Sequence, residues 1–159
     1  MPRIWGIDPG LTGGCAIYDV AADACIDVVD IPTIGEDAKK RIDVAELGRW
    51  ARKHGATHGV IERAQAMPDQ GSSSGFIYGR GVGYLEACVV MCDVPLKIIE
   101  VRAWKKYFNL KGKSDGGGEA ARALVIQRFP RVSELFARKM DHGRAEALLI
   151  AIYGATVVK

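Results

Sequence analysis

The chain has 159 residues, of which 48% are hydrophobic and 26% are charged. That length suits one well-packed domain and is too short for two, so we interpret residues 1–159 as a single domain. No apolar run approaches the roughly 18 residues that a membrane span needs, and the first residues lack the basic region and apolar block of a secretory signal. We therefore expect a cytoplasmic protein with no membrane partner.

The formal net charge of +3 is unevenly distributed along the chain. Residues 1–37 contain one basic and seven acidic residues, whereas residues 97–139 contain 11 basic and four acidic residues. The basic second half is a candidate phosphate-binding surface, although an ordinary solvated face explains the charge equally well.

The first part of the chain predicts three short strands and a helix. Residues 3–8, 14–20 and 25–31 have strand-like patterns, and the short links between them predict antiparallel neighbours. Asp43 and Glu46 form a capping-box pattern at the start of a helix that ends near Gly55.

The second part predicts alternating helices and strands. In order, these are a strand at 58–62, a loop at 63–75, a helix at about 76–92, a strand at 95–100, a short helix at 101–108, a loop at 109–118, a helix at 119–129 and a last helix from about Asp141. Together with the first part, this order predicts an α/β fold: a five-stranded mixed sheet, three strands antiparallel and then two parallel, with helices on both faces.

The four cysteines have no C-x-x-C spacing. A cytosolic chain of this size needs no disulfides, and two thiols four residues apart on a helix make a poor zinc site. We therefore predict that the cysteines pack in the core. They are Cys15, Cys25, Cys88 and Cys92.

Two acidic residues end predicted strands, and two more begin the last helix. If the strands that end in Asp8 and Glu62 are neighbours, both carboxylates project at the same edge of the sheet. Asp141 and Glu146 of the last helix can reach that edge. Converging carboxylates repel one another, which raises their pKa values unless cations neutralise them, and oxygen ligands suit Mg²⁺ or Mn²⁺.

Each carboxylate also has a structural interpretation. Asp8 can organise the turn that follows it, because aspartate often accepts hydrogen bonds from backbone amides in turns. Glu62 can be a solvated strand end. Asp141 is a good helix cap by residue type alone.

Four sequence motifs follow one another along the chain. They are GIDPGLTGGCAIYD, VIERAQAMPDQGSSS, the basic LKGKSD leading into EAARALVIQRFP, and DHGRAEALLIAIYG. Together they resemble the RuvC-type Holliday junction resolvases of the RNase H-like superfamily, and the second and last motifs are most similar to phage and bacterial RuvC-like proteins and to plant chloroplast resolvases. GIDPG alone is also found in sugar kinases and actin-like ATPases, but those proteins need two such domains.

The resemblance implies a site for two Mg²⁺ or Mn²⁺ ions. The implied ligands are Asp8, Glu62, Glu146 and, with a departure from the family pattern, Asp141. The departure is Gly143, where the best-known bacterial pattern has an acid or a histidine. We favour Asp141 as the substitute, because a cap residue can still swing into the site, and we retain His142, which shares a helix face with Glu146, as the alternative.

The resemblance also implies DNA-binding residues. Lys113 would be the catalytic lysine at the scissile phosphate, and other residues would contact the junction, with Met67 or Phe76 as a wedge between bases or simply as packing residues. The implied DNA-binding set is Arg63, Gln65, Met67, Gln70, Lys106, Lys111 and Lys113.

These inferences predict a homodimeric, metal-dependent endodeoxyribonuclease that resolves four-way junctions by symmetric nicks in DNA recombination and repair. Two alternatives stay open: a nuclease of this fold for forks, flaps or other branched phage DNA, and a junction-binding protein without catalysis. We expect a bacterial or phage origin rather than an organellar one, and the sequence specifies neither a cutting-site preference nor a branch-migration helicase as partner.

Overall fold

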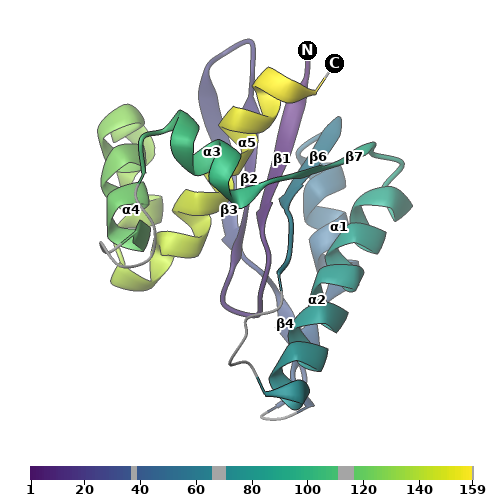
Figure 1. Cartoon of the computed structure of the whole chain (residues 1–159). Coiled ribbons are helices and arrows are strands. Elements are labelled where there is room, and N and C mark those ends of the chain that lie inside the picture. The colour runs from purple at the N-terminus through teal and green to yellow at the C-terminus, as the bar shows by residue number, and fades with distance from the viewer. Residues whose placement is uncertain (37–38, 66–70, 111–116, 159) are drawn as a thin grey trace.

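The computed structural model describes residues 1–36, 39–65, 71–110 and 117–158. A five-stranded sheet with the order β3-β2-β1-β6-β7 forms its centre (Figure 1). β1 (Arg3–Asp8), β2 (Gly14–Asp19) and β3 (Ala24–Asp30) are antiparallel, and β6 (His58–Glu62) and β7 (Leu96–Ile99) continue the sheet parallel to β1. The predicted mixed sheet is confirmed.

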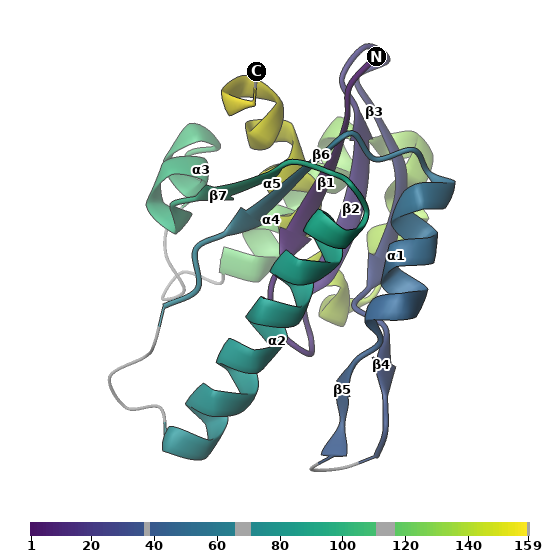
Figure 2. The same cartoon turned by 90° about the vertical axis from the view of Figure 1, so that its right-hand side faces the viewer.

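Helices cover both faces of this sheet, as predicted (Figure 2). α1 (Val44–Lys53) and α2 (Ser72–Met91) lie on one face. α3 (Val101–Tyr107), α4 (Gly117–Arg128) and α5 (His142–Val157) lie on the other. Two short 3₁₀ segments, η3 (Pro130–Phe136) and η4 (Lys139–Asp141), connect α4 to α5.

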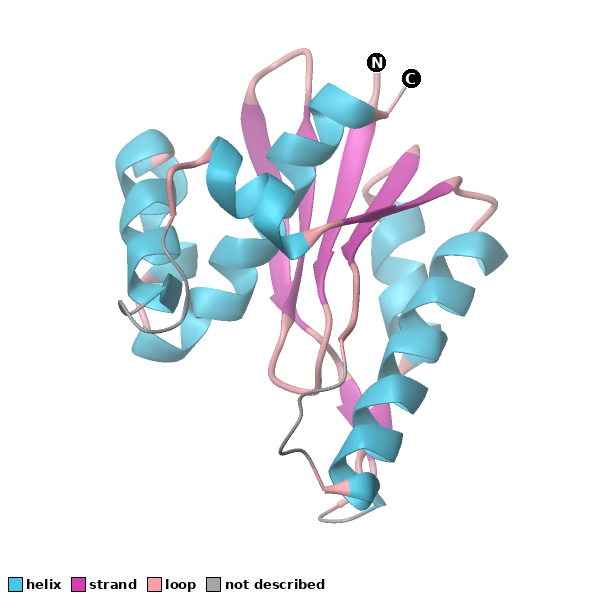
Figure 3. Ribbon diagram, viewed as in Figure 1, coloured by secondary structure: helices cyan, strands magenta, loops and turns pink. Residues whose placement is uncertain are grey.

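Local signals set some element boundaries correctly and missed others (Figure 3). Asp43 caps α1 as predicted, because its side chain accepts a hydrogen bond from the Glu46 amide at 3.0 Å. α2 begins at Ser72 rather than near residue 76. The small hairpin of β4 (Thr33–Ile34) and β5 (Arg41–Ile42) was not predicted, because two-residue strands carry no readable alternation.

The two faces of the sheet have separate hydrophobic clusters. Ile4 and Val60 pack toward α5, whereas Trp5, Ile7 and Ile61 pack toward α1 and α2. This division follows from the alternation of side chains along a strand.

α5 lies directly against the backbone of β1. A Cβ atom at Gly6 would lie 2.1 Å from the carbonyl oxygen of Ala147 and 2.6 Å from the amide nitrogen of Ala151. Only glycine permits this approach, so Gly6 fixes how closely the last helix packs on the sheet.

All four cysteines belong to the hydrophobic clusters or pack against them, as predicted, and all four thiols are free. Three are buried and Cys92 is partly buried. Within the described parts of the chain, every helix is too short or too polar to cross a membrane.

Candidate active site

Asp8 and Glu62 end adjacent parallel strands. Ile7 pairs with Ile61 in the register of β1 and β6, and the two acidic residues follow directly. Asp8 alternates in phase with Gly6, and Glu62 with Val60, so both side chains point to the face of the sheet that α5 covers. The condition on which the predicted cluster depended is therefore met.

Glu146 is brought to the same place by the packing of α5. It directly precedes Ala147, which lies against Gly6, and its side chain is only 16% exposed. Asp8, Glu62 and Glu146 all line one open cleft of about 1580 Å³. Three of the four predicted carboxylates thus share one cleft.

Helix α3 contributes two residues that the sequence did not predict: Lys105 lines the cleft, and Trp104, which does not line it, contacts Glu62. The buried Trp104 donates a hydrogen bond from Nε1 to Oε2 of Glu62 at 3.0 Å. Nζ of Lys105 lies 3.7 Å from Oε1 of Glu146, and both side chains are less than one-fifth exposed. A signal for them existed, because α3 follows the carboxyl end of β7, where sites in parallel sheets gather.

Tyr78 of α2 also lines the cleft from the opposite face of the sheet. Burial raises the pKa of its hydroxyl, and the carboxylates of Glu62 and Asp8 raise it further. The hydroxyl is therefore protonated at neutral pH and can donate a hydrogen bond.

Asp141 does not line the cleft, contrary to our preference for it as the fourth ligand. Its side chain is 1% exposed; Oδ2 accepts a hydrogen bond from the Arg138 amide at 2.7 Å, and Oδ1 accepts one from Arg138 Nε at 2.8 Å. A buried carboxylate needs such partners, and here the preceding 3₁₀ turn supplies them. His142 does line the cleft, so the structure brings the alternative residue, not Asp141, to the other three.

The departure at Gly143 has a steric reason. A Cβ atom there would lie 3.0 Å from the carbonyl oxygen of Thr12 and 3.0 Å from the carbonyl carbon of Gly13. The turn between β1 and β2 occupies the space that a side chain would need. An acid at this position would displace that turn.

The predicted DNA-binding residues fall into two groups. Arg63, Gln65 and Lys106 line the same cleft, and Arg63 Nε lies 2.6 Å from Oε1 of Glu100. The others lie outside the described residues, so their roles stay predictions. They are Met67, Gln70, Lys111 and Lys113.

Comparisons with known proteins bear on the fold. No model of a protein family matches this sequence. The structure of T. thermophilus RuvC in complex with a Holliday junction substrate is similar, with a TM-score of 0.62 and 18% identity over 99% of this chain and 97% of RuvC. The chain has the fold of RuvC. The Fowlpox virus Holliday junction resolvase is also similar, with a TM-score of 0.61 and 13% identity over 98% of this chain and 99% of the viral chain.

One curated relative matches part of this chain. It is the chloroplastic Holliday junction resolvase MOC1 of Chlamydomonas reinhardtii, which is 29% identical over 98 residues. The match covers 62% of this chain but only 11% of MOC1. The comparisons therefore confirm the predicted RNase H-like fold and the resemblance on which it rested.

The residues of the cleft fit a hard divalent cation by their chemistry but do not form a ready-made metal site. Three carboxylates on one cleft offer the oxygen donors that Mg²⁺ and Mn²⁺ prefer. Among the described residues, however, no three His, Cys, Asp or Glu side chains are arranged to hold one ion together. Glu146 lies next to Lys105 instead, with Oε1 3.7 Å from Nζ.

Proposed function

We propose that this protein is a structure-selective endodeoxyribonuclease that resolves Holliday junctions. A metal-dependent reaction would nick opposed strands symmetrically. Attack of a water oxygen on phosphorus breaks the P–O3′ bond and leaves 5′-phosphate and 3′-hydroxyl ends.

The observation that carries this proposal is the meeting of three carboxylates and a lysine on one cleft of a RuvC-like fold. Asp8 and Glu62 come from adjacent strand ends, Glu146 from α5 and Lys105 from α3. Elements that lie far apart in the sequence thus supply one site, as is usual for catalytic constellations in α/β folds.

The carboxylates have a role that follows from their position. Asp8, Glu62 and Glu146 would hold Mg²⁺ or Mn²⁺, and the family resemblance implies two ions in the site. His142 is the best-placed fourth ligand, and Asp141 would first have to leave Arg138. Divalent ions bound there supply an activated water and neutralise charge on the leaving oxygen.

Basic residues of the cleft would hold the DNA backbone. The Lys105 ammonium, next to Glu146, is placed to face the phosphoryl oxygens where negative charge develops. Arg63 and Lys106 are exposed on the same cleft and would bind neighbouring phosphates. Lys113 retains its predicted catalytic role, which rests on the family resemblance alone.

A homodimer would let the protein cut both strands. One surface of α2 exposes apolar and small residues, with Phe76 69%, Val90 59% and Met91 73% exposed. A Cβ atom at Gly79 or Gly83 would meet nothing within 4 Å, so another chain can approach this helix closely. We assign this surface to a second copy of the chain, because a two-fold axis matches two symmetric cuts.

The decisive experiment uses an immobile four-way junction with labelled strands. The intact protein and Asp8→Asn are each incubated with Mg²⁺, Mn²⁺ or EDTA, and cleavage and junction binding are both recorded. Paired nicks that disappear with EDTA and in the variant, while binding persists, support the proposal.

Two other results would replace the proposal. Faster cutting of forks or flaps than of the junction would make the protein a nuclease for other branched DNA. Binding of the junction with no cutting in either metal would make it a junction-binding protein.

A further inference from the structure

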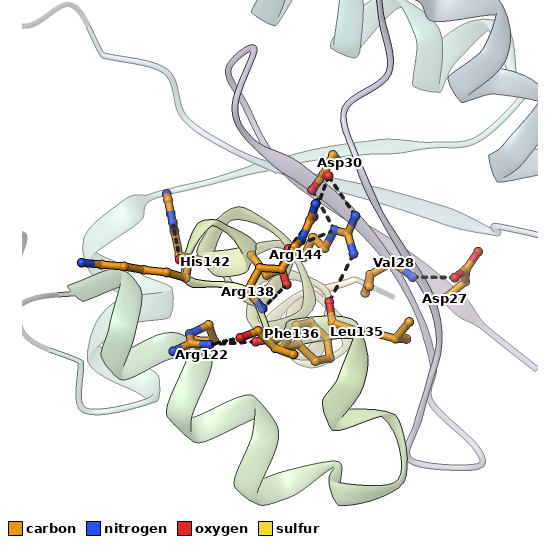
Figure 4. Close-up of polar contacts among 12 residues, drawn as sticks. Asp27, Val28, Asp30, Arg122, Leu135, Phe136, Arg138, His142 and Arg144 are labelled. Carbon is orange, nitrogen blue, oxygen red and sulfur yellow. Dashed lines mark hydrogen bonds and ion pairs between the residues drawn. The ribbon is translucent and has the colours of Figure 1, made fainter.

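A group of four charged side chains lies at the start of α5, and Figure 4 labels three of them, Asp30, Arg138 and Arg144. We call it the anchor cluster, and it consists of Asp30, Arg138, Asp141 and Arg144. Two carboxylates face two guanidinium groups, so the cluster is neutral as a whole. The predicted function does not use these four residues, apart from the suggestion that Asp141 is a ligand.

Asp30 joins segments that are more than one hundred residues apart. It ends β3, and its oxygens accept hydrogen bonds from Arg144 Nε at 2.7 Å and from Arg144 Nη2 at 2.8 Å. Arg138 Nη2 donates a further bond to the same carboxylate at 2.9 Å. The forked contact with Arg144 fixes direction as well as distance.

The two arginines connect Asp30 to the first turn of α5. Arg138 also binds Asp141, the residue directly before α5, and Nη1 of Arg144 donates a hydrogen bond to the Leu135 carbonyl at 3.2 Å. Arg144 itself lies on α5, two residues before Glu146. The anchor cluster therefore ties the start of α5 to the sheet and to the 3₁₀ segments.

The end of β3 is in turn linked to the cleft. The Ile31 amide donates a hydrogen bond to the Gly13 carbonyl at 3.3 Å, and Gly13 lies against Gly143 of α5. The negative charge of Asp30 is also stable, because Arg144 and Arg138 lower the pKa of its carboxyl group. Asp30 is thus a fixed negative charge at neutral pH.

We propose that Asp30 is a positioning residue for the active site: through Arg144 and Arg138 it holds the first turns of α5, so that Glu146 and His142 face the cleft. This inference rests on the proposed function for its effect on cleavage. Its structural half, the holding of α5, stands on the contacts alone.

The test compares three substitutions in the full-length protein. Asp30→Asn keeps the size of the side chain and removes its charge, and Asp30→Glu restores the charge. Asp23→Asn is the matched control, because Asp23 makes a similar exposed ion pair with Arg128 at 3.0 Å, and neither residue lines the cleft. Hydrogen–deuterium exchange of peptides covering residues 142–150 is measured together with cleavage and binding of a four-way junction.

For Asp30→Asn we expect faster exchange in the first turns of α5 and a cleavage rate reduced about tenfold, with junction affinity unchanged. A small displacement of a reacting group is enough for such a loss. Asp30→Glu should partly restore slow exchange in α5 and the cleavage rate. Asp23→Asn should leave both the exchange and the cleavage rate unchanged.

Two results would overturn the proposal. One is exchange in α5 that is the same for Asp30→Asn and the intact protein. The other is equal loss in Asp30→Asn and Asp23→Asn, which would indicate a general effect of charge. If the intact protein does not cut DNA, the proposed function fails, while the exchange data still decide whether Asp30 holds α5.

Discussion

The two faces of the sheet differ in how their helices meet it. On the α5 face, backbone contacts the backbone of β1 and β2 through Gly6 and Gly14, whose Cβ atoms would lie 2.1 Å from Ala147 O and 2.6 Å from Arg144 N. On the α2 face, side chains mediate the packing, and the outer side of the helix stays exposed. The face with backbone contacts carries Glu146, and α2 on the other face exposes apolar surface, to which we assign a second copy of the chain.

This difference shows which helix must be positioned accurately on the sheet. A helix that must deliver a carboxylate to a strand end has little tolerance, because a shift of about 1 Å can cost a large factor in rate. A helix that binds another subunit can use an exposed apolar surface and small residues instead. The predictions below test this division, beginning with the largest expected effect.

Removal of the Asp8 carboxylate, on the face that α5 covers, should have the largest effect on DNA cleavage. We expect Asp8→Asn to lower the cleavage rate by on the order of 10³-fold, since metal ions contribute several kcal/mol to such reactions. Glu46→Gln, an exposed acid on α1, is the control and should cut normally. Calorimetric titration with Mn²⁺ should show weaker binding in Asp8→Asn alone, and unchanged Mn²⁺ affinity would contradict the assignment.

Two buried glycines, one on each face, test the packing difference directly. Gly6→Ala should destabilise the protein by about 3 kcal/mol, because the added methyl group meets the backbone of α5. Gly81→Ala should be neutral or stabilising by up to about 1 kcal/mol, since its Cβ would make an ordinary contact with Ile42 at 3.5 Å in a helix. Urea denaturation measures both changes, and equal losses would refute the distinction.

The lysine of the cleft should affect chemistry more than binding. Lys105→Met keeps the aliphatic stem and loses the charge next to Glu146, so we expect a cleavage rate about 100-fold lower. Lys106→Met removes an exposed charge and should mainly weaken junction affinity. Single-turnover rates and gel-shift affinities separate the two effects, and identical behaviour of both variants would count against a special role for Lys105.

A charge on the exposed surface of α2 should separate the subunits. Gly83→Glu adds a side chain where nothing lies within 4 Å, so the monomer should fold normally. Like charges meeting across a two-fold interface should raise the dimer dissociation constant about tenfold or more. Analytical ultracentrifugation should show this for Gly83→Glu but not for Ala45→Glu on the exposed side of α1; an unchanged dimer would move the interface elsewhere.

Acid should weaken the anchor cluster by a small amount. The pKa of Asp30 lies below its usual value of 3.8, mainly because Arg144 binds the carboxylate. A lowered pKa contributes stability above the unfolded value, and this contribution disappears as the pH falls through the folded value. The free energy of unfolding of the intact protein should exceed that of Asp30→Asn by less than about 1 kcal/mol at pH 7, because solvent screens the ion pair. This difference should shrink below about pH 4. A difference that is independent of pH in urea denaturation would contradict this.

Much of the fold could be predicted because local sequence patterns indicate the strands and the helix starts. The alternation of apolar residues and the short links identified β1, β2 and β3, and Asp43 with Glu46 identified the start of α1. Asp8 and Glu62 could be predicted as partners, because the carboxyl ends of parallel strands meet at one edge.

The site's remaining residues depended on packing that no local pattern reveals. By itself the sequence determined the five strands of the main sheet, most of the helices and the two strand-end acids, since these depend on spacing and residue type. Only the tertiary structure decided that Lys105 lines the cleft and that Trp104 binds Glu62. It also decided that Asp141 is bound by Arg138 while His142 lines the cleft. The physical reason is that a buried charge takes whichever partner the packed chain brings to it. For Asp141 that partner is Arg138 of the preceding turn, and for Glu146 it is Lys105 of a helix far away in the sequence.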